Sequence, residues 1–265
     1  MTSRRILVAV IGLFSLFLAG CATNQAIQDK ARAHTTVGAA YIKSEMYTEA
    51  LRELFAAEKL DPRDPTIHYY LGIAYMGKDA RDHAMDSFRR AVSLKPDYSE
   101  AHNYIGVLLL EQGQWDQAIA AFDRALANIL YETPAGSLFN KGWALYRKGA
   151  YEASLDCYQD AVRKRDAYTL LPLLQRSMGL SSLALGRIDD AAFYFGEAVK
   201  MVPHYIEAKY WLAVTRVQQR QYGEARELFL EVSRDETPRS EFAPRAKEML
   251  EKMNKRQYGE IRWQP

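Results

Sequence analysis

The chain has 265 residues, of which 48% are hydrophobic and 26% are charged, a balance that is typical of a folded domain and not of a disordered or fibrous chain. Lys and Arg number 35 against 33 Asp and Glu. Because nucleic-acid binding needs a clear excess of positive charge, we expect no nucleic-acid partner.

The N-terminus has the pattern of a secretory signal peptide. Arg4 and Arg5 precede an apolar stretch, Ile6 to Leu18, that is too short to cross a hydrocarbon core of about 30 Å. We therefore expect residues 1–20 to be removed. Without the two arginines, 33 basic side chains remain against 33 acidic ones, so the mature chain is formally neutral.

The residues that follow indicate a lipid anchor. Leu18-Ala19-Gly20-Cys21 resembles the lipobox of bacterial lipoproteins, which implies acylation of Cys21 and a short tether over residues 21–30. Several acyl chains anchor a protein firmly, whereas one chain binds only marginally. Ala22 stands where an aspartate would signal retention at the inner membrane of enterobacteria, so the periplasmic face of the outer membrane is favoured. An ordinary secretory signal with a chance cysteine is the alternative.

A repeated motif organises the rest of the chain. Tyr70-Leu71-Gly72-Ile73-Ala74-Tyr75 is followed by Ala84, Phe88, Ala91 and Pro96, and related residues return at intervals of 34, 34, 36, 37 and 34. The pattern resembles the tetratricopeptide repeat, a pair of amphipathic helices that is stable only when stacked on its neighbours. The resemblance implies an all-α, right-handed superhelical solenoid of about six repeats over residues 31–239, with starts near 31, 65, 99, 135, 172 and 206.

A closing helix is expected after the last repeat. Phe242, Ala246, Met249, Leu250 and Met253 recur at helical spacing, so residues 240–256 predict an amphipathic helix that caps the open apolar side of the array. Residues 257–265 then form a C-terminal tail.

The sequence gives no sign of catalysis. His34, His68 and His102 recur at position 4 of the first three repeats, but stacked repeats hold equivalent residues about 8–10 Å apart, too far for one metal ion. We interpret these imidazoles as packed and hydrogen-bonded. We interpret Cys157 as a small apolar residue within a helix, since no nearby base would activate its thiol. We expect no enzymatic activity, no metal, no small-molecule substrate and no cofactor apart from the lipid on Cys21; an enzyme that uses the long connections as a site is a remote alternative.

Function is therefore expected in a surface. Positions 5, 9 and 12 of each first helix form one stripe, which lines the concave groove in repeat solenoids of this kind. This stripe is mostly apolar and predicts a hydrophobic or amphipathic protein segment as partner. The alternative is that part of the stripe is core between neighbouring first helices. The expected groove residues are Tyr69, Ile73, Met76, Val107, Leu110, Phe139, Trp143, Tyr146, Leu180, Leu183, Tyr210 and Val214.

The lipobox, the six repeats and the closing helix together resemble the type IV pilus biogenesis lipoproteins of the PilF/PilW/Tgl family, the secretin pilotins. The resemblance implies a protein that binds secretin monomers, promotes their localisation and multimerisation in the outer membrane, and so supports pilus-driven motility. Another lipid-anchored repeat scaffold, serving outer-membrane protein assembly or peptidoglycan enzymes, is the alternative.

Overall fold

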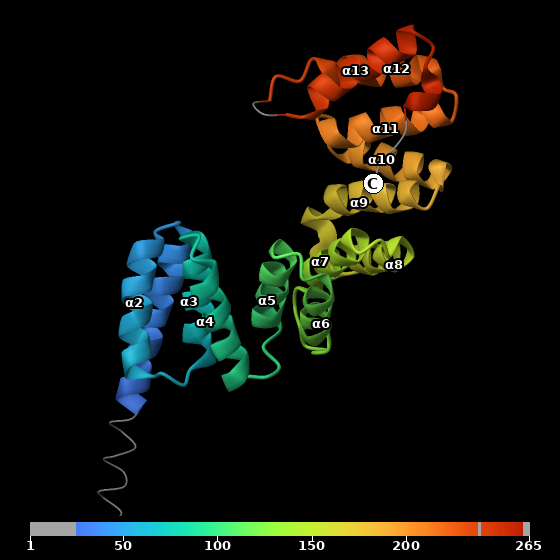
Figure 1. Cartoon of the computed structure of the whole chain (residues 1–265). Helices are drawn as coiled ribbons and strands as arrows, with labels where there is room; N and C mark the ends of the chain where they lie inside the picture. The colour runs from blue at the N-terminus through green and yellow to red at the C-terminus, as the bar shows by residue number, and fades with distance from the viewer. Residues whose placement is uncertain (1–24, 238–239, 262–265) are drawn as a thin grey trace, which may run out of the picture. The chain divides into compact units, whose positions relative to one another are not determined.

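The computed structural model describes residues 25–237 and 240–261. The expected signal peptide and Cys21 lie outside these residues. The described part of the chain is helical and contains no strand, and none of its helices has the length and apolarity that a membrane span requires. The chain divides into two compact units, Met1–Leu108 and Leu109–Pro265, whose helices are shown in Figure 1.

Unit 1 consists of antiparallel helix pairs. Residues 25–43 are helical, so the part of the expected tether from residue 25 onward belongs to the first helix instead. The helices that follow are α2 (Tyr47–Leu60), α3 (Pro65–Gly77), α4 (Arg81–Leu94) and α5 (Ser99–Glu111), of which the last crosses into unit 2 at its end.

Unit 2 repeats the same arrangement. Its elements are α6 (Trp115–Leu126), α7 (Pro134–Arg147), α8 (Tyr151–Val162), the 3-10 helix η1 (Arg165–Thr169), α9 (Leu171–Ala184), α10 (Ile188–Met201), α11 (Ile206–Gln218), α12 (Tyr222–Ser233), α13 (Phe242–Asn254) and η2 (Tyr258–Glu260). In both units the first helices α3, α5, α7, α9 and α11 begin within one residue of the expected repeat starts. The extra residues at the longer intervals lie in the α6–α7 connection and in η1.

Small residues allow the two helices of each repeat to approach closely. A Cβ atom built on Gly72 would lie 2.5 Å from Cε1 of Phe88, and one on Gly142 or Gly179 would lie 2.6 Å from the ring of Tyr158 or Phe195. These three rings are completely buried. The glycine at position 8 therefore provides the space that the aromatic ring at position 24 occupies.

The turn between the two helices of every repeat uses one residue with a left-handed backbone. It stands at position 15 of each unit: Glu45, Asp79, Gly113, Gly149, Gly186 and Arg220, with φ between 59° and 83°. A left-handed residue is the usual way to end a helix and redirect the chain. Its return at the same position six times supports the count of six repeats independently of the apolar pattern.

The C-terminal residues close the array. α13 lies within the expected capping segment and buries Ala246, Met249 and Met253. The first part of the expected C-terminal tail, residues 257–261, includes η2 and packs against the last repeats. The ring of Tyr258 stacks on that of Tyr222 at 4.0 Å, and Ile261 is only 1% exposed within the core of the last repeats. Burial of these apolar side chains holds the segment against the repeats.

Candidate partner-binding surface

In unit 1, the predicted groove residues Tyr69, Ile73, Met76 and Val107 are all half-buried. The ring of Tyr69 lies 5.2 Å from that of Tyr70, 5.0 Å from that of Tyr98 and 6.0 Å from that of Tyr104. Burial in this cluster raises the pKa of the Tyr69 hydroxyl well above its ordinary value. Tyr69 therefore helps to pack α3 and leaves only part of its surface for a partner.

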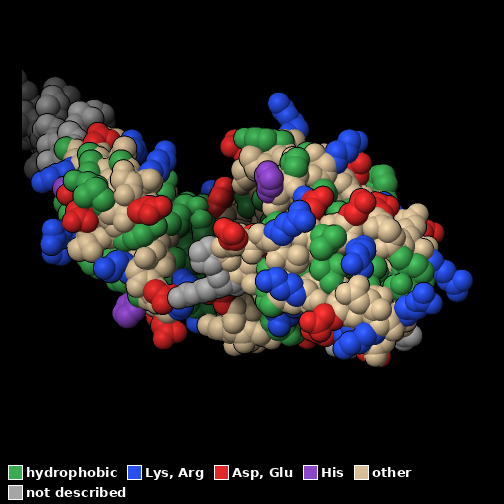
Figure 2. Space-filling model, turned by 90° about the horizontal axis from the view of Figure 1, so that it is seen from above, with side chains coloured by type: hydrophobic (Ala, Val, Ile, Leu, Met, Phe, Trp, Pro, Cys, Tyr) green, Lys and Arg blue, Asp and Glu red, His purple; other side chains and the backbone are tan. Residues whose placement is uncertain are grey.

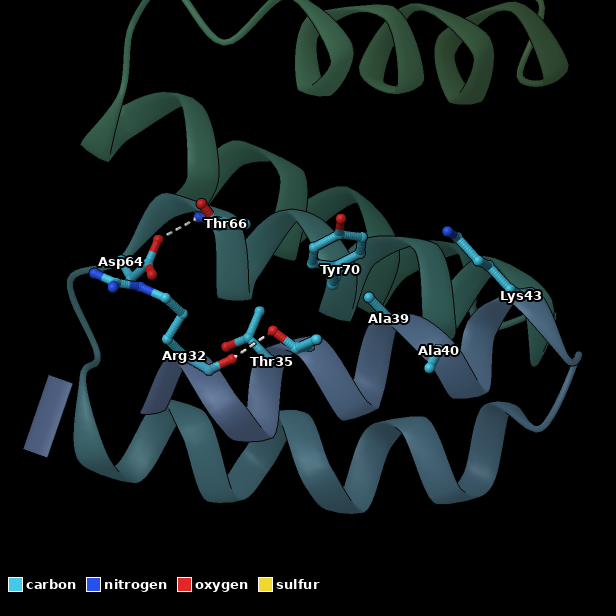
Figure 3. A pocket seen from close by; sticks show the side chains of 9 residues that line it. Arg32, Thr35, Ala39, Ala40, Lys43, Asp64, Thr66 and Tyr70 are labelled. Carbon is cyan, nitrogen blue, oxygen red and sulfur yellow. Dashed lines mark hydrogen bonds between the residues drawn. The ribbon is translucent and has the colours of Figure 1, made fainter. Parts of the chain in front are cut away.

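A pocket of about 530 Å³ lies beside this cluster, between the first helix and α3 (Figure 3). Ala39 and Ala40 form its low floor, and Tyr70 stands over them from α3. Arg32 and Lys43 lie on opposite sides of these residues in this view. The pocket therefore combines a small apolar floor with a cation at each end, an arrangement that suits an apolar side chain next to a carboxylate.

The polar groups of this pocket are largely satisfied within the protein. The hydroxyl of Thr35 donates to the carbonyl oxygen of Ala31 at 2.9 Å, and the side chain of Asp64 accepts from the amide of Thr66 at 2.8 Å. Asp64 thereby caps the N-terminus of α3, where a negative charge is favourable. These side chains shape the pocket and need no ligand to satisfy their hydrogen bonds.

In unit 2, the predicted groove includes Trp143 and Tyr146 of α7. Both are half-buried, and their rings stack at 5.3 Å with only 8° between their planes. The guanidinium of Arg147 lies 4.8 Å from the ring of Trp115 and 5.8 Å from that of Trp143. We call Trp115, Trp143, Tyr146 and Arg147 the aromatic shelf.

The aromatic shelf has a second cation at its border. The guanidinium of Arg176 lies 6.0 Å from the Trp143 ring and forms an ion pair with Glu207. Cations over an aromatic face are held by its quadrupole, which fixes the arginines beside the rings. The shelf thus combines half-buried aromatic rings with guanidinium groups close to them, an arrangement suited to an amphipathic segment that carries carboxylates.

Two other predicted groove residues of unit 2 are half-buried as well. Leu110 is the penultimate residue of α5, and Phe139 lies one helical turn before Trp143. The Phe139 ring contacts that of the buried Tyr158 at 5.7 Å, so much of Phe139 is used in packing α7 on α8.

The prediction is wrong for the last two repeats. Leu180, Leu183, Tyr210 and Val214 are 1–5% exposed and belong to one core cluster. The reason is the C-terminal cover: the ring of Tyr210 contacts that of Phe242 at 5.5 Å, and Ile261 joins the same cluster. Positions that would face a groove in the middle of an array become core where the array is capped.

Sequence reasoning also missed two members of the shelf. Trp115 and Arg147 lie outside positions 5, 9 and 12, so the stripe did not include them. A signal in the sequence could have identified them. Arg147 follows Tyr146 on α7, and Trp115 begins α6, the second helix of the preceding repeat; an arginine and a tryptophan so placed favour a cation–π contact.

The surroundings of the three repeat histidines and of Cys157 are those of residues that stabilise the fold. His68 and His102 each donate a ring N–H to the carbonyl of a preceding proline, Pro62 and Pro96, at 2.9 and 2.8 Å. His34 instead pairs with Glu53 at 2.6 Å. Over the described ranges, no group of three potential metal-ligating side chains occurs. Cys157 is buried, and burial raises the pKa of its thiol, which disfavours the reactive thiolate.

The face of the molecule seen in Figure 2 carries mixed charge. Figure 2 shows Lys and Arg side chains interspersed with Asp and Glu over the face that it presents. This distribution agrees with the nearly equal numbers of basic and acidic residues, and it leaves apolar and aromatic side chains, not a field of one sign, as the distinguishing feature of the candidate surface.

Comparisons with known proteins agree with this architecture. Four family models, described as tetratricopeptide repeat or TPR repeat, match residues 28–79, 65–98, 97–167 and 182–244. No curated protein matches the sequence.

Solved structures with the same fold include PilW, PilF and YrrB. PilW, described as a widely conserved type IV pilus biogenesis factor, is 22% identical, with a TM-score of 0.71 over 82% of this chain and 98% of PilW. PilF of Pseudomonas aeruginosa is 16% identical, with a TM-score of 0.73 over 84% of this chain and 99% of PilF. YrrB, a TPR protein with an unusual peptide-binding site, is 17% identical, with a TM-score of 0.60 over 74% and 97%. At these identities the likeness concerns the fold. The six helix pairs, the matching family models and this likeness in fold together establish that the chain is a tetratricopeptide repeat protein.

Proposed function

We propose that the chain is a lipid-anchored, non-enzymatic scaffold that binds secretin subunits and promotes their localisation and multimerisation in type IV pilus biogenesis. Three observations support the proposal: the lipobox that ends at Cys21, the similarity in fold to PilW and PilF, and an apolar surface in a repeat fold that typically binds protein segments.

The aromatic shelf is the observation that carries the proposal. Stacked, half-buried Trp143 and Tyr146 present a rigid apolar surface, and large aromatic side chains with arginine dominate the binding energy of protein interfaces. The bound segment is proposed to be amphipathic, with apolar side chains on the rings and a carboxylate near the exposed Arg147. Truncation of one such ring would cost about 2 kcal/mol or more of binding energy.

Binding through the shelf can be tested with matched variants. Trp143→Glu combined with Tyr146→Glu should abolish co-purification of the secretin from envelopes, because charge would replace the apolar contact surface. Phe193→Glu is the control, since Phe193 is an exposed aromatic on α10, 61% accessible and outside the shelf. Far-UV circular dichroism should show equal helicity in all samples. Secretin capture by the double variant at the wild-type level would exclude the shelf as the binding surface.

The cellular role has a separate readout. Deletion of the gene should leave secretin as monomers and remove pili and twitching or gliding motility, because the multimer would no longer assemble. Heat-resistant secretin oligomers at normal abundance in the deletion strain would refute the pilotin role and favour another envelope scaffold.

The anchor is also part of the proposal. Cys21 is proposed to carry the lipid that places the protein at the periplasmic face of the outer membrane. Cys21→Ala should release the protein from the membrane fraction and misplace the secretin, because the acyl chains supply the membrane affinity. Metabolic labelling with a palmitate analogue gives a direct measurement, and equal labelling of the Cys21→Ala variant would contradict it.

A further inference from the structure

Two connections in unit 2 expose large apolar side chains. In the α6–α7 connection, Ile129 is 95% and Leu130 is 80% exposed; in η1, Tyr168 is 74% exposed. These connections are the two places where the repeat interval is longer than 34 residues. The inserted residues therefore add apolar side chains to the surface instead of polar ones, which is unusual for a loop.

The two connections are held together at the start of α7. The side chain of Asp166 in η1 accepts a hydrogen bond from the amide of Ala135 at 3.0 Å. In the other connection, the hydroxyls of Tyr131 and Ser137 are 3.1 Å apart. These contacts fix both connections to the first turn of one helix, so their exposed side chains belong to the same edge of the unit.

Basic side chains accompany these apolar residues. Arg163, Lys164 and Arg165 are consecutive and exposed. Arg163 pairs with Asp160 at 2.7 Å, whereas no ion pair joins Lys164 or Arg165 to any residue in the described ranges. Of the two acidic residues in the connections, Asp166 is engaged at the α7 amide and Glu132 is exposed. The edge therefore offers two available cations beside its apolar side chains.

We propose that this edge is a membrane-contact surface, on which Ile129, Leu130 and Tyr168 enter the headgroup boundary of a bilayer while Lys164 and Arg165 bind its anionic headgroups. Three protruding side chains offer far less than the roughly 800 Å² that each partner contributes to a stable protein interface. A bilayer needs no complementary shape and attracts exposed Lys and Arg through its negative surface potential. The inference is independent of secretin binding and adds a second membrane contact to the proposed anchor at Cys21.

The proposal can be tested by measuring local immersion in the full chain reconstituted into vesicles. A spin label is placed at Leu130→Cys, or for comparison at Phe193→Cys, in a Cys157→Ala background, and a sample without an introduced cysteine gives the background signal. In vesicles that contain phosphatidylglycerol, the label at position 130 should lose accessibility to a water-soluble nickel chelate and gain accessibility to oxygen. The label at position 193 should remain accessible to the chelate.

The electrostatic part has its own matched control. Lys164→Glu with Arg165→Glu should restore chelate access at position 130. Lys247→Glu with Lys255→Glu should not, although it changes the net charge equally at two exposed positions, one on α13 and one just after it. Equal chelate access at positions 130 and 193 in these vesicles would overturn the proposal. Protection of position 130 without vesicles, increasing with protein concentration, would also overturn it and identify the edge as a contact between copies of the chain.

Discussion

Two glycines of α7 offer a direct test of how the repeats pack. Alanine in place of either residue improves helix propensity by about 1 kcal/mol. At Gly136 the new Cβ would meet no atom within 4 Å, so Gly136→Ala should stabilise the chain by up to that amount. At Gly142 the Cβ would lie 2.6 Å from Cε1 of Tyr158, whose ring is completely buried. The ring cannot move away without disturbing α8, and such overpacking costs about 1–3 kcal/mol.

The difference between the two variants isolates the packing term. Gly142→Ala should be less stable than Gly136→Ala by about 1–3 kcal/mol, because the propensity gain is common to both. Urea unfolding followed by far-UV circular dichroism measures the difference when both variants are compared with the wild type. If the two variants unfold at the same urea concentration, the close approach of α7 and α8 and the reasoning about position 8 are both wrong.

Three further outcomes are expected. Gly149→Ala should destabilise the chain by about 1 kcal/mol or more, because the φ of 83° at this position is left-handed. No neighbour lies within 4 Å of the new Cβ, so backbone strain alone accounts for the loss, which thermal unfolding measures. Burial raises the pKa of Tyr69 above the ordinary 10.0, so above about pH 10 the unfolded state loses this proton more readily than the folded state. The stability of the wild type should therefore fall more steeply than that of Tyr69→Phe as the pH rises through about 10. Urea titrations at pH 9 and 11 compare the two proteins. The thiol of Cys157 should react with a soluble disulfide reagent only after unfolding, and rapid reaction of the native protein would contradict its burial.

The repeat fold could be predicted because its information is local and recurs. Gly72 with Phe88 and Gly142 with Tyr158 obey one packing rule. A small residue at position 8 with a large apolar one at position 24 returns in all six repeats, so the rule is recognisable from spacing alone. The left-handed residue at position 15 was harder to identify, because three of the six positions are Glu45, Asp79 and Arg220. Glutamate and arginine seldom adopt a left-handed backbone, so at these positions the geometry of the turn imposes the conformation.

The candidate surface was predictable only in part, because exposure depends on what else covers a residue. The stripe at positions 5, 9 and 12 includes Trp143 and Tyr146, which remain half-buried. It also includes Leu180 and Tyr210, which obey the same periodicity but are buried in the core cluster that the C-terminal residues join. No helical period in the repeats contains the information that Ile261, more than fifty residues after Tyr210 in sequence, joins the same core.

The C-terminal cover explains why the candidate surface is confined to the earlier repeats. A repeat array must bury the apolar side of its last unit, and here α13 and the segment up to Ile261 do so by packing on residues that equivalent repeats leave accessible. Stability at the end of the array and a binding surface are therefore alternative uses of the same side chains. Trp143 and Tyr146 keep part of their surface because they lie at the border of this core, with Tyr146 packed against it and Trp143 held between Arg147 and Arg176. A partner that contacts the shelf would thus meet rings that the protein's own packing has already fixed in place, which lowers the entropy lost on binding.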